Sequence, residues 1–335
     1  MAKQRGKLQT DLEYAAVRLL LGALGIMPRR TAVAAGRGLG RLAYALAGGL
    51  RRTGLRNLEL AFPEMGEGER RRTLRRSMVG LGRQLGEFSQ FPRATPESLR
   101  DLVEYDGIEI LHEARARGRG VIFLTCHLGA WEILSFAHSA LYNPISFMVR
   151  RLDNPRVEEL IDDVRTRFGN RSIDKKMAAR SALKLLREGG TLGILADLNT
   201  QPHEGVFVPF FDRLACTTSG IAVLALRTDA AVIPVVAPWH EERGRYVFHG
   251  SPIVELVRTG DHERDVEINT ARFTAAIEEQ IRKYPDQWLW IHKRWKTRPD
   301  GEPDLYGSAA VTQKLTATHA QTPQDGVLGT KPQKS

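Results

Sequence analysis

The stretch Val121-Ile122-Phe123-Leu124-Thr125-Cys126-His127-Leu128-Gly129-Ala130-Trp131-Glu132 largely determines the fold and the chemistry that we expect of this chain. It opens with an apolar, β-branched run, which predicts a buried strand, and Trp131 to Tyr142 follows as a predicted helix. His127 and Glu132 lie five positions apart, so on one continuous helix they would face about 140° away from each other. The two side chains can meet only if His127 stands at the strand end and the chain turns back at Gly129.

A histidine beside a carboxylate at a strand end indicates proton-transfer chemistry. Neutral imidazole is a general base near pH 7. A carboxylate bonded to the other ring nitrogen fixes the tautomer and stabilises the imidazolium that forms. We therefore predict His127 as a general base that takes a proton from a hydroxyl attacking an acyl group, with Glu132 orienting the ring. On this motif alone, a half-buried histidine and a surface glutamate are the commoner interpretation.

Further motifs put this pair in a family context. The His-x4-Glu pattern is similar to the signature of glycerolipid acyltransferases and, more narrowly, resembles the bacterial lipid A biosynthesis lauroyl/myristoyl (late) acyltransferase family. Four other stretches resemble the same family in the same order: 56–64 (RNLELAFPE), 150–155 (RRLDNP), 205–211 (GVFVPFF) and 287–299 (QWLWIHKRWKTRP). The resemblance covers about residues 10 to 300, and the ordered set is far more specific than the single motif.

The resemblance implies a membrane-associated O-acyltransferase that moves a fatty acyl group from an acyl thioester to a lipid hydroxyl. The donor would be carried on acyl carrier protein or coenzyme A, and the acceptor would be a lipid A precursor. In relatives, an arginine at the position of Arg150 is proposed to hold the substrate or the oxyanion, and Arg151 is its alternative. Asp197 matches a carboxylate of the family, but Leu198 replaces the usual Gln or His, so Asp197 is expected to position structure or substrate.

Strands alternating with helices predict an α/β fold with a mixed, mostly parallel sheet flanked by helices, similar to the glycerolipid acyltransferases. We expect an N-terminal membrane-associated helical region at 1–60 and a catalytic domain at 61–300. After Pro299 the chain loses its apolar periodicity, so 301–335 is predicted to be a disordered tail. The strand predictions include 145–149, 191–196 and 231–237, with 246–250 and 253–255 as antiparallel edge strands, and 217–228 is predicted to be a helix that begins with capping hydroxyls.

The N-terminal region is apolar and basic. Leu12 to Met27 carries Glu13 and Arg18 and is shorter than the roughly 20 residues that a spanning helix needs. As a helix it would carry one broad apolar face: Leu12, Ala15, Ala16, Leu19, Leu20, Ala23 and Met27. A helix in the membrane interface, an ordinary packing helix and a single N-terminal pass all remain open.

Two further N-terminal helices are predicted. The helix at 31–50 contains Gly36, Gly38 and Gly40, which permit close helix contact but weaken an isolated helix. The helix at 67–88 carries an arginine stripe that could face lipid phosphates, although a solvated face is the alternative: Arg70, Arg71, Arg72, Arg75, Arg76 and Arg83. Together these features favour the cytoplasmic face of the bacterial inner membrane.

The aromatic segments have two interpretations each. Phe207, Phe210 and Phe211 could line an acyl groove, because burying an alkyl chain against apolar rings contributes about 0.8 kcal/mol per CH₂. Core packing explains the same residues equally well. The tryptophans at 288, 290 and 295, interleaved with cations, could anchor at lipid headgroups or belong to the core.

Composition limits the other function classes. The chain has 335 residues, 42% of them hydrophobic and 26% charged, as a globular protein does, and a net charge of +10 suits an anionic membrane or an acidic partner. Two cysteines provide no disulfide framework, and we expect no secretory signal, no metal and no cofactor. The remaining alternatives are another acceptor (a lysophospholipid, glycolipid or aminolipid), a thioesterase, and a basic membrane- or nucleic-acid-binding protein, although no nucleic-acid partner is expected.

Overall fold

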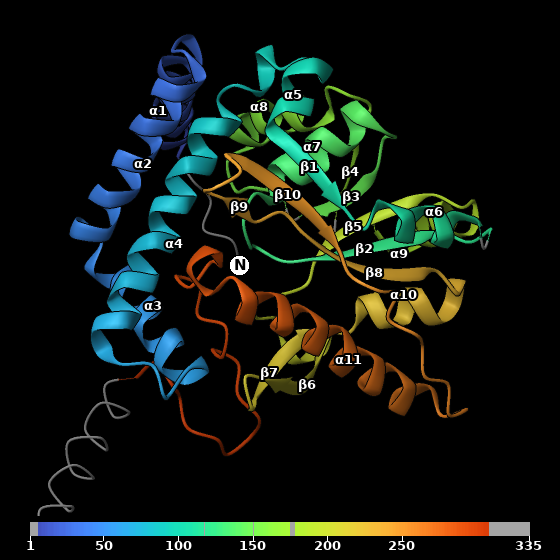
Figure 1. The fold of residues 1–335 in the computed structure, drawn as a ribbon. Helices are drawn as coiled ribbons and strands as arrows, with labels where there is room; N and C mark the ends of the chain where they lie inside the picture. The colour runs from blue at the N-terminus through green and yellow to red at the C-terminus, as the bar shows by residue number, and fades with distance from the viewer. Residues whose placement is uncertain (1–5, 117, 150, 175–177, 308–335) are drawn as a thin grey trace, which may run out of the picture.

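Figure 1 shows the computed structural model, which describes residues 6–116, 118–149, 151–174 and 178–307. The helices are α1 (Lys7–Ile26), α2 (Arg29–Leu46), α3 (Gly48–Ala61), α4 (Glu67–Phe88), α5 (Pro96–Leu102), α6 (Ile108–Ala116), α7 (Trp131–Leu141), α8 (Pro155–Thr166), α9 (Ala178–Arg187), α10 (Gly220–Thr228) and α11 (His262–Lys283), with short 3₁₀ turns at Phe91–Arg93, Pro202–Glu204 and Pro285–Gln287. The strands are β1 (Val103–Asp106), β2 (Val121–Thr125), β3 (Ser146–Val149), β4 (Arg171–Asp174), β5 (Thr191–Leu195), β6 (Gly205–Phe210), β7 (Arg213–Thr218), β8 (Ala231–Val236), β9 (Trp239–His240) and β10 (Arg245–Gly250).

Eight strands form one mixed sheet in the order β1-β10-β8-β2-β5-β3-β4, with β9 paired to β10. The pairs on both sides of β2 are parallel, and so are β3–β5, β3–β4 and β1–β10. The antiparallel pairs of this sheet are β10–β8 and β10–β9, so β1 and β10 run opposite to its other strands. A separate antiparallel hairpin, β6-β7, lies below the sheet near α11 (Figure 1).

β2 is buried along its whole length because both faces of the sheet are covered. Ile122 and Leu124 point to a core that includes side chains of α3, α4, α9, α10 and α11. Val121 and Phe123 point to the opposite core, which includes side chains of α5, α6 and α7. The alternation follows from the two-residue period of a strand, and it makes β2 the centre of the molecule.

Four glycines set the contact between α2 and α4. A Cβ atom on Gly36 would lie 2.2 Å from the carbonyl oxygen of Gly82, and one on Gly82 would lie 2.1 Å from that of Gly36. Gly40 meets the backbone of Met78, and Gly86 meets that of Ala32, in the same way. The two backbones therefore touch directly, as small residues four apart on facing helices allow, and this confirms the predicted close contact for Gly36 and Gly40. Gly38 faces away, with no atom within 4 Å of its Cβ position.

The predicted fold class is confirmed as an α/β structure with a mostly parallel sheet flanked by helices. Some local predictions are wrong. Thr217 and Thr218 end strand β7 instead of capping a helix, because the 205–218 segment folds back on itself as a hairpin and α10 begins only at Gly220. The 253–255 segment has no strand assignment, and β10 is an interior strand because β1 lies beyond it.

α1 presents the predicted apolar face to solvent. Leu12 and Leu19 are 62% and 72% exposed, and Leu24 is the residue that the helix buries. No helix within the described ranges is long and apolar enough to cross a membrane.

The C-terminal end of the described chain packs against α3. Arg56 Nε donates to the carbonyl of Leu305, and Tyr306 Oη donates to Asn57 Oδ1 at 2.5 Å. Residues 301–307 of the predicted tail are thus part of the structure, and 308–335 lie outside the described residues.

The α2–α4 contact predicts opposite effects for one substitution at two neighbouring sites. We expect Gly36→Ala to lower the free energy of unfolding by about 1–3 kcal/mol, because its methyl group must push apart two backbones. Gly38→Ala should leave stability unchanged or raise it by up to about 1 kcal/mol, since alanine favours helix and the site is open. Urea unfolding of both variants measures the difference, and equal stabilities would contradict the packing.

Candidate active site

The register of two neighbouring strands brings His127 and Asp197 together. β2 and β5 are parallel, with Thr125 opposite Leu195. Both strands end at these residues. His127 follows the end of β2 by two residues, and Asp197 follows the end of β5 by two residues. The carboxyl edge of a parallel sheet is where ligands generally bind, so this pairing marks the candidate site.

A turn at Gly129 releases the chain from β2 into α7, as predicted. Gly129 has φ +62°, and a Cβ atom there would lie 2.1 Å from the carbonyl oxygen of Ala237. The Gly129 and Ala130 amides donate to the carbonyls of Gln287 and Ala237, at 3.0 and 2.8 Å. The turn is therefore fixed from both sides, by the end of β8 and by the segment after α11.

Asp197 holds His127 through two hydrogen bonds and is itself held by a third, from Trp288. Its Oδ1 lies 2.9 Å from His127 Nδ1, and its Oδ2 accepts from the His127 backbone N–H, also at 2.9 Å. Trp288 Nε1 donates to the same Oδ2 at 2.7 Å. An ionised Asp197 places the proton on Nδ1 and leaves Nε2 as the basic nitrogen. Asp197, predicted only as a positioning carboxylate, thus makes the orienting contact that we had predicted for Glu132.

Glu132 forms a different pair. It lies in the first turn of α7, and Arg165 of α8 donates to both of its carboxylate oxygens, with the Nε–Oε2 distance at 2.9 Å. The prediction that Glu132 bonds to the imidazole ring is wrong in this structure, because the carboxylate turns towards the guanidinium on the neighbouring helix. Glu132 still acts on His127 through its charge.

The pair is electrostatically coupled. Burial by itself would lower the pKa of His127, but the charge of Asp197, its hydrogen bond to the ring and the charge of Glu132 raise that pKa above its ordinary value. Burial by itself would raise the pKa of Asp197, but the His127 charge and the hydrogen bonds from His127 and Trp288 hold that pKa below its ordinary value. Asp197 therefore stays ionised, and His127 is a stronger base than free imidazole.

The predicted arginine position is only partly visible. Arg150 lies outside the described residues. Arg151 is 69% exposed and donates from Nε to Asp174 Oδ2 at 3.0 Å, at the ends of β3 and β4. The structure gives Arg151 no contact with His127.

Two of the three phenylalanines predicted to line an acyl groove, Phe210 and Phe211, do not line one. Phe210 and Phe211 are buried in the core, where their rings pack edge-on against each other and against Trp288 and Phe62. This is the core-packing alternative, and it follows from the β6-β7 hairpin, whose tip packs under the tryptophan segment. Phe207 is half-buried on β6.

The tryptophan segment is also core. Trp288, Trp290 and Trp295 are buried, and Arg294 among them is 0% exposed. Arg294 donates to the carbonyl of Cys216 and to Thr217 Oγ1, and burial lowers its pKa to about 10. These residues therefore do not face lipid headgroups. They are packed in the core next to Asp197, to which Trp288 donates a hydrogen bond.

A small apolar cavity lies beside the catalytic turn. It has a volume of about 70 Å³ and is enclosed by side chains of β2, β3, β5 and α7. Trp131 and Glu132 line it, and the Trp131 ring meets the His127 ring edge-on, with centroids 5.0 Å apart. Arg165 completes its polar side. An apolar cavity next to the predicted general base would suit an alkyl substrate.

Three neighbours of the pair were not predicted from the sequence in these positions. Trp288 donates to Asp197, Arg165 donates to Glu132, and His292 feels the charges of Asp197 and His127 while its Nε2 accepts from the Asn199 backbone N–H at 3.1 Å. Burial lowers the pKa of His292, so it is neutral. One signal was available: Asp197 follows its strand at the same offset as His127 follows β2. Within the described residues, no group of His, Cys, Asp and Glu side chains could hold a metal ion.

The chain is similar to known proteins over most of its length. The family model described as bacterial lipid A biosynthesis acyltransferase matches residues 3–297. The lipid A biosynthesis lauroyltransferase of Escherichia coli K12 is 30% identical over 278 residues, covering 81% of this chain and 87% of that protein. The myristoyltransferase and the palmitoleoyltransferase of the same strain are 28% and 29% identical, over 80% and 75% of this chain and 82% and 80% of theirs.

Titration of His127 tests the geometry. We expect Asp197→Asn to lower the folded-state pKa of His127, because the amide removes the nearest negative charge. Since that pKa is raised in the folded protein, the charged pair stabilises the fold fully below about pH 6.5, and this contribution disappears as the pH rises through the folded pKa. NMR titration of the imidazole, assigned with His127→Ala, measures the shift.

Glu132→Gln is the matched control for this titration, because the charge of Glu132 acts on His127 less than that of Asp197 does. This variant should lower the pKa of His127 by less than Asp197→Asn does. A larger shift in Glu132→Gln than in Asp197→Asn would contradict the assignment of Asp197 as the orienting carboxylate.

Proposed function

The chain belongs to the bacterial lipid A biosynthesis acyltransferase family and is an acyltransferase; from this premise we propose that it moves a fatty acyl group from an acyl thioester to a hydroxyl of a lipid A precursor. The thioester is carried on acyl carrier protein or coenzyme A. The observation that carries the proposal is the buried Asp197 carboxylate on His127 Nδ1, which leaves Nε2 free to accept a proton.

The reaction needs one direct attack. His127 Nε2 takes the proton of the acceptor hydroxyl as its oxygen bonds to the thioester carbonyl carbon. Asp197 stabilises the imidazolium that forms. When the tetrahedral intermediate collapses, the carbon–sulfur bond breaks, and the imidazolium returns its proton to the leaving thiol. Arg150 keeps its predicted role beside the oxyanion in this proposal, a role that rests on the family resemblance.

No covalent acyl-enzyme takes part in this scheme. Cys126 adjoins His127, but it is fully buried, and burial raises the pKa of its thiol well above the ordinary value. A protonated, enclosed thiol is a poor nucleophile. Both substrates must therefore be bound at once, which requires two places beside His127.

The apolar cavity at Trp131 is proposed to receive part of the acyl chain. Its volume of about 70 Å³ is little more than two water molecules occupy in the liquid, at about 30 Å³ each. It can thus hold only a segment of the chain. The three relatives are named for lauroyl, myristoyl and palmitoleoyl transfer, so the family alone does not fix the chain length.

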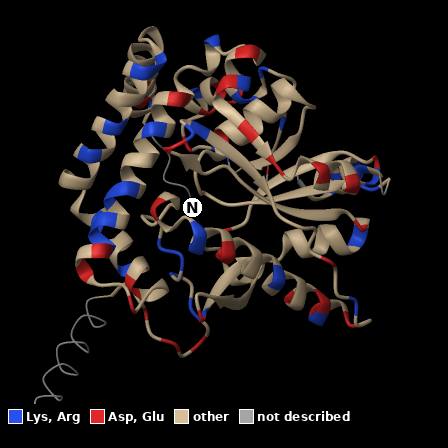
Figure 2. Cartoon of the chain, viewed as in Figure 1, with Lys and Arg blue, Asp and Glu red and all other residues tan. Residues whose placement is uncertain are grey.

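Association with the cytoplasmic surface of the inner membrane is the second part of the proposal. The supporting observation is a set of exposed leucines on the outer sides of the N-terminal helices: Leu8, Leu12, Leu19, Leu20, Leu39, Leu42, Leu46 and Leu50. Leucines on helices that also carry many arginines suit an interfacial position (Figure 2). The net charge of +10 also favours encounter with an acidic carrier protein.

Acyl transfer from a labelled acyl-carrier-protein thioester to a lipid A precursor in detergent micelles tests the reaction. We expect His127→Ala to reduce kcat at least about 100-fold, because the general base is lost, and Asp197→Asn to reduce it by a comparable factor. Cys126→Ala is the control, and it should keep its turnover. Activity of His127→Ala equal to that of the wild type, or an acyl group trapped on the protein, would contradict the mechanism.

The same assay with lysophospholipids and with water as acceptor separates this reaction from transfer to another lipid and from thioester hydrolysis. We expect the lipid A precursor to be the acceptor with the highest kcat/KM. Free fatty acid as the main product would identify a thioesterase instead.

Membrane binding has its own test. We expect the double variant Leu19→Glu with Leu46→Glu to bind anionic vesicles at least about tenfold more weakly, as measured by co-sedimentation. The reason is that each exposed leucine contributes about 1.5–3 kcal/mol when it is buried. The matched control is Leu152→Glu with Leu214→Glu, which changes two exposed leucines outside these helices. Equal loss in the two double variants would show that charge alone, not this face, controls binding.

A further inference from the structure

A second and much larger cavity lies between α2 and α4 and the β9-β10 region. Its volume is about 680 Å³, within the range of small-molecule sites. Six arginines line it, two from α2 and four from α4: Arg37, Arg41, Arg72, Arg75, Arg76 and Arg83. The α4 members follow a helical spacing that keeps them on one face, and the close α2–α4 contact brings the α2 members to the same hollow.

The cavity has an excess of positive charge. Its two carboxylates are Glu241, which is 3.8 Å from Arg37 and 3.2 Å from Arg83, and Asp286, which is 3.7 Å from Arg76. Arg41, Arg72 and Arg75 have no carboxylate within 4.0 Å in the described part of the chain. Unpaired guanidinium groups that converge on one hollow favour an anion.

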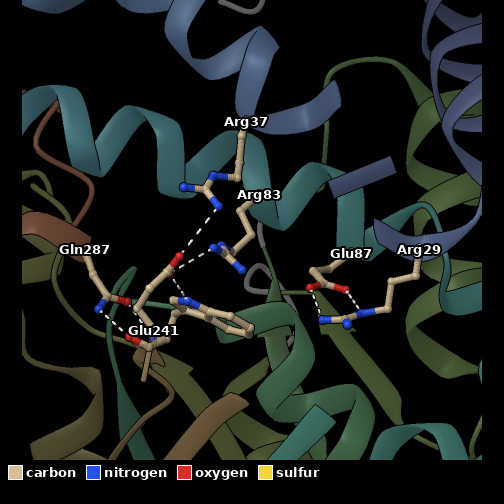
Figure 3. A network of polar contacts seen from close by, with 7 residues as sticks. Arg29, Arg37, Arg83, Glu87, Glu241 and Gln287 are labelled. Atoms are coloured by element: carbon tan, nitrogen blue, oxygen red, sulfur yellow. Dashed lines mark hydrogen bonds and ion pairs between the residues drawn. The ribbon is translucent and has the colours of Figure 1, made fainter. Parts of the chain in front are cut away.

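Part of the wall is held by contacts within the protein. Arg83 is 8% exposed, its guanidinium lies 3.8 Å from the centre of the Trp239 ring, and it is held by Glu241 (Figure 3). Gln287 exchanges two hydrogen bonds with the Trp239 backbone, at 2.8 and 3.0 Å. Such preorganisation reduces the loss of side-chain entropy on binding.

The wall also contains unused hydrogen-bonding groups. Tyr246 is 1% exposed, and its hydroxyl has no partner among the described residues. The carbonyl oxygen of the Gln84 side chain is buried and unpartnered in the same way. Both residues line the cavity. Buried polar groups without partners are uncommon in proteins, and here they accompany unpaired cations.

The cavity reaches the catalytic turn. Gly129, two residues after His127, is part of its wall, and so is Gln287, whose carbonyl accepts from the Gly129 amide at 3.0 Å. Trp131, two residues further on, lines the apolar cavity instead. An anion bound here would therefore lie on the other side of the turn from the proposed acyl chain.

We propose that this arginine-lined cavity binds a phosphate-bearing sugar headgroup and thereby places the acceptor lipid beside His127. Guanidinium groups bind phosphate oxygens in pairs, and several can share one phosphate. The hollow suits a compact polar headgroup more than the convex surface of a carrier protein. The sugar and the statement that the bound lipid is the acceptor rest on the proposed function; the phosphate group rests on the unpaired arginines.

Direct binding tests the ligand class. The probe is glucosamine 1-phosphate, measured by calorimetry in the His127→Ala background so that no reaction intervenes. We expect Arg72→Gln with Arg75→Gln to weaken binding by about tenfold to a hundredfold, as loss of charged hydrogen bonds predicts. The matched control, Arg52→Gln with Arg71→Gln, removes two exposed arginines that do not line the cavity, and it should bind as the parent does.

Three results would overturn the ligand class. They are equal weakening in both double variants, equal binding of glucosamine without phosphate, and inorganic phosphate that binds as tightly as the sugar phosphate. The last would assign the site to a free ion. All four arginines are exposed, so the variants should fold, and circular dichroism checks this.

Kinetics test the link to the acceptor. We expect the cavity variant to raise the KM of the phosphorylated acceptor at least about tenfold, with little change in kcat and in the KM of the donor. A rise in the KM of the acyl-carrier-protein thioester, without one for the coenzyme A thioester, would assign the surface to the carrier protein and overturn the proposal. The chain could also show no transferase activity while its binding of the sugar phosphate still depends on these arginines. That result would contradict the proposed function and support the ligand class.

Discussion

The buried carboxylate of Asp197 joins the three parts of the chain on which the site depends. It accepts from the backbone and faces the ring of His127 after β2, it follows β5 itself, and it accepts from Trp288 in the C-terminal segment. A buried charge without partners would be strongly destabilising, and each of these bonds offsets part of that penalty. The same contacts that keep Asp197 ionised also fix His127 in one tautomer. The stability of this junction and the basicity of the His127 imidazole therefore have one origin.

The N-terminal helices connect this junction to the arginine-lined cavity. Glycines four residues apart let the α2 and α4 backbones touch, and this closeness aligns arginines from both helices on one hollow. Ser77 of α4 donates to the Trp288 carbonyl at 2.5 Å, so α4 is also bonded to the segment that holds Asp197. A change in helix packing would therefore reach the His127–Asp197 pair through Ser77 and Trp288.

The sequence predicted local features well and distant ones poorly. β2, the turn at Gly129 and α7 follow from apolar runs and glycine, which depend on neighbours along the chain. The partner of His127 depends on the pairing of β2 with β5, 70 positions apart, and sequence proximity favoured Glu132 instead. Phe210 and Phe211 could not be assigned from sequence either, because an acyl groove and a protein core call for the same apolar rings. Only the β6-β7 hairpin, which buries both, decides between them.

In the proposed direct transfer, the acyl chain of the thioester and the polar headgroup of the acceptor lipid must both be held beside one histidine. The acyl chain calls for an apolar cavity and the headgroup for a cationic one, so a single cavity would have to be both at once. Three residues of one turn separate the two environments, since Gly129 lines the cationic cavity and Trp131 lines the apolar one. His127 stands at the start of that turn. The tight backbone at Gly129, where no side chain fits, is what allows the two environments to lie so close together.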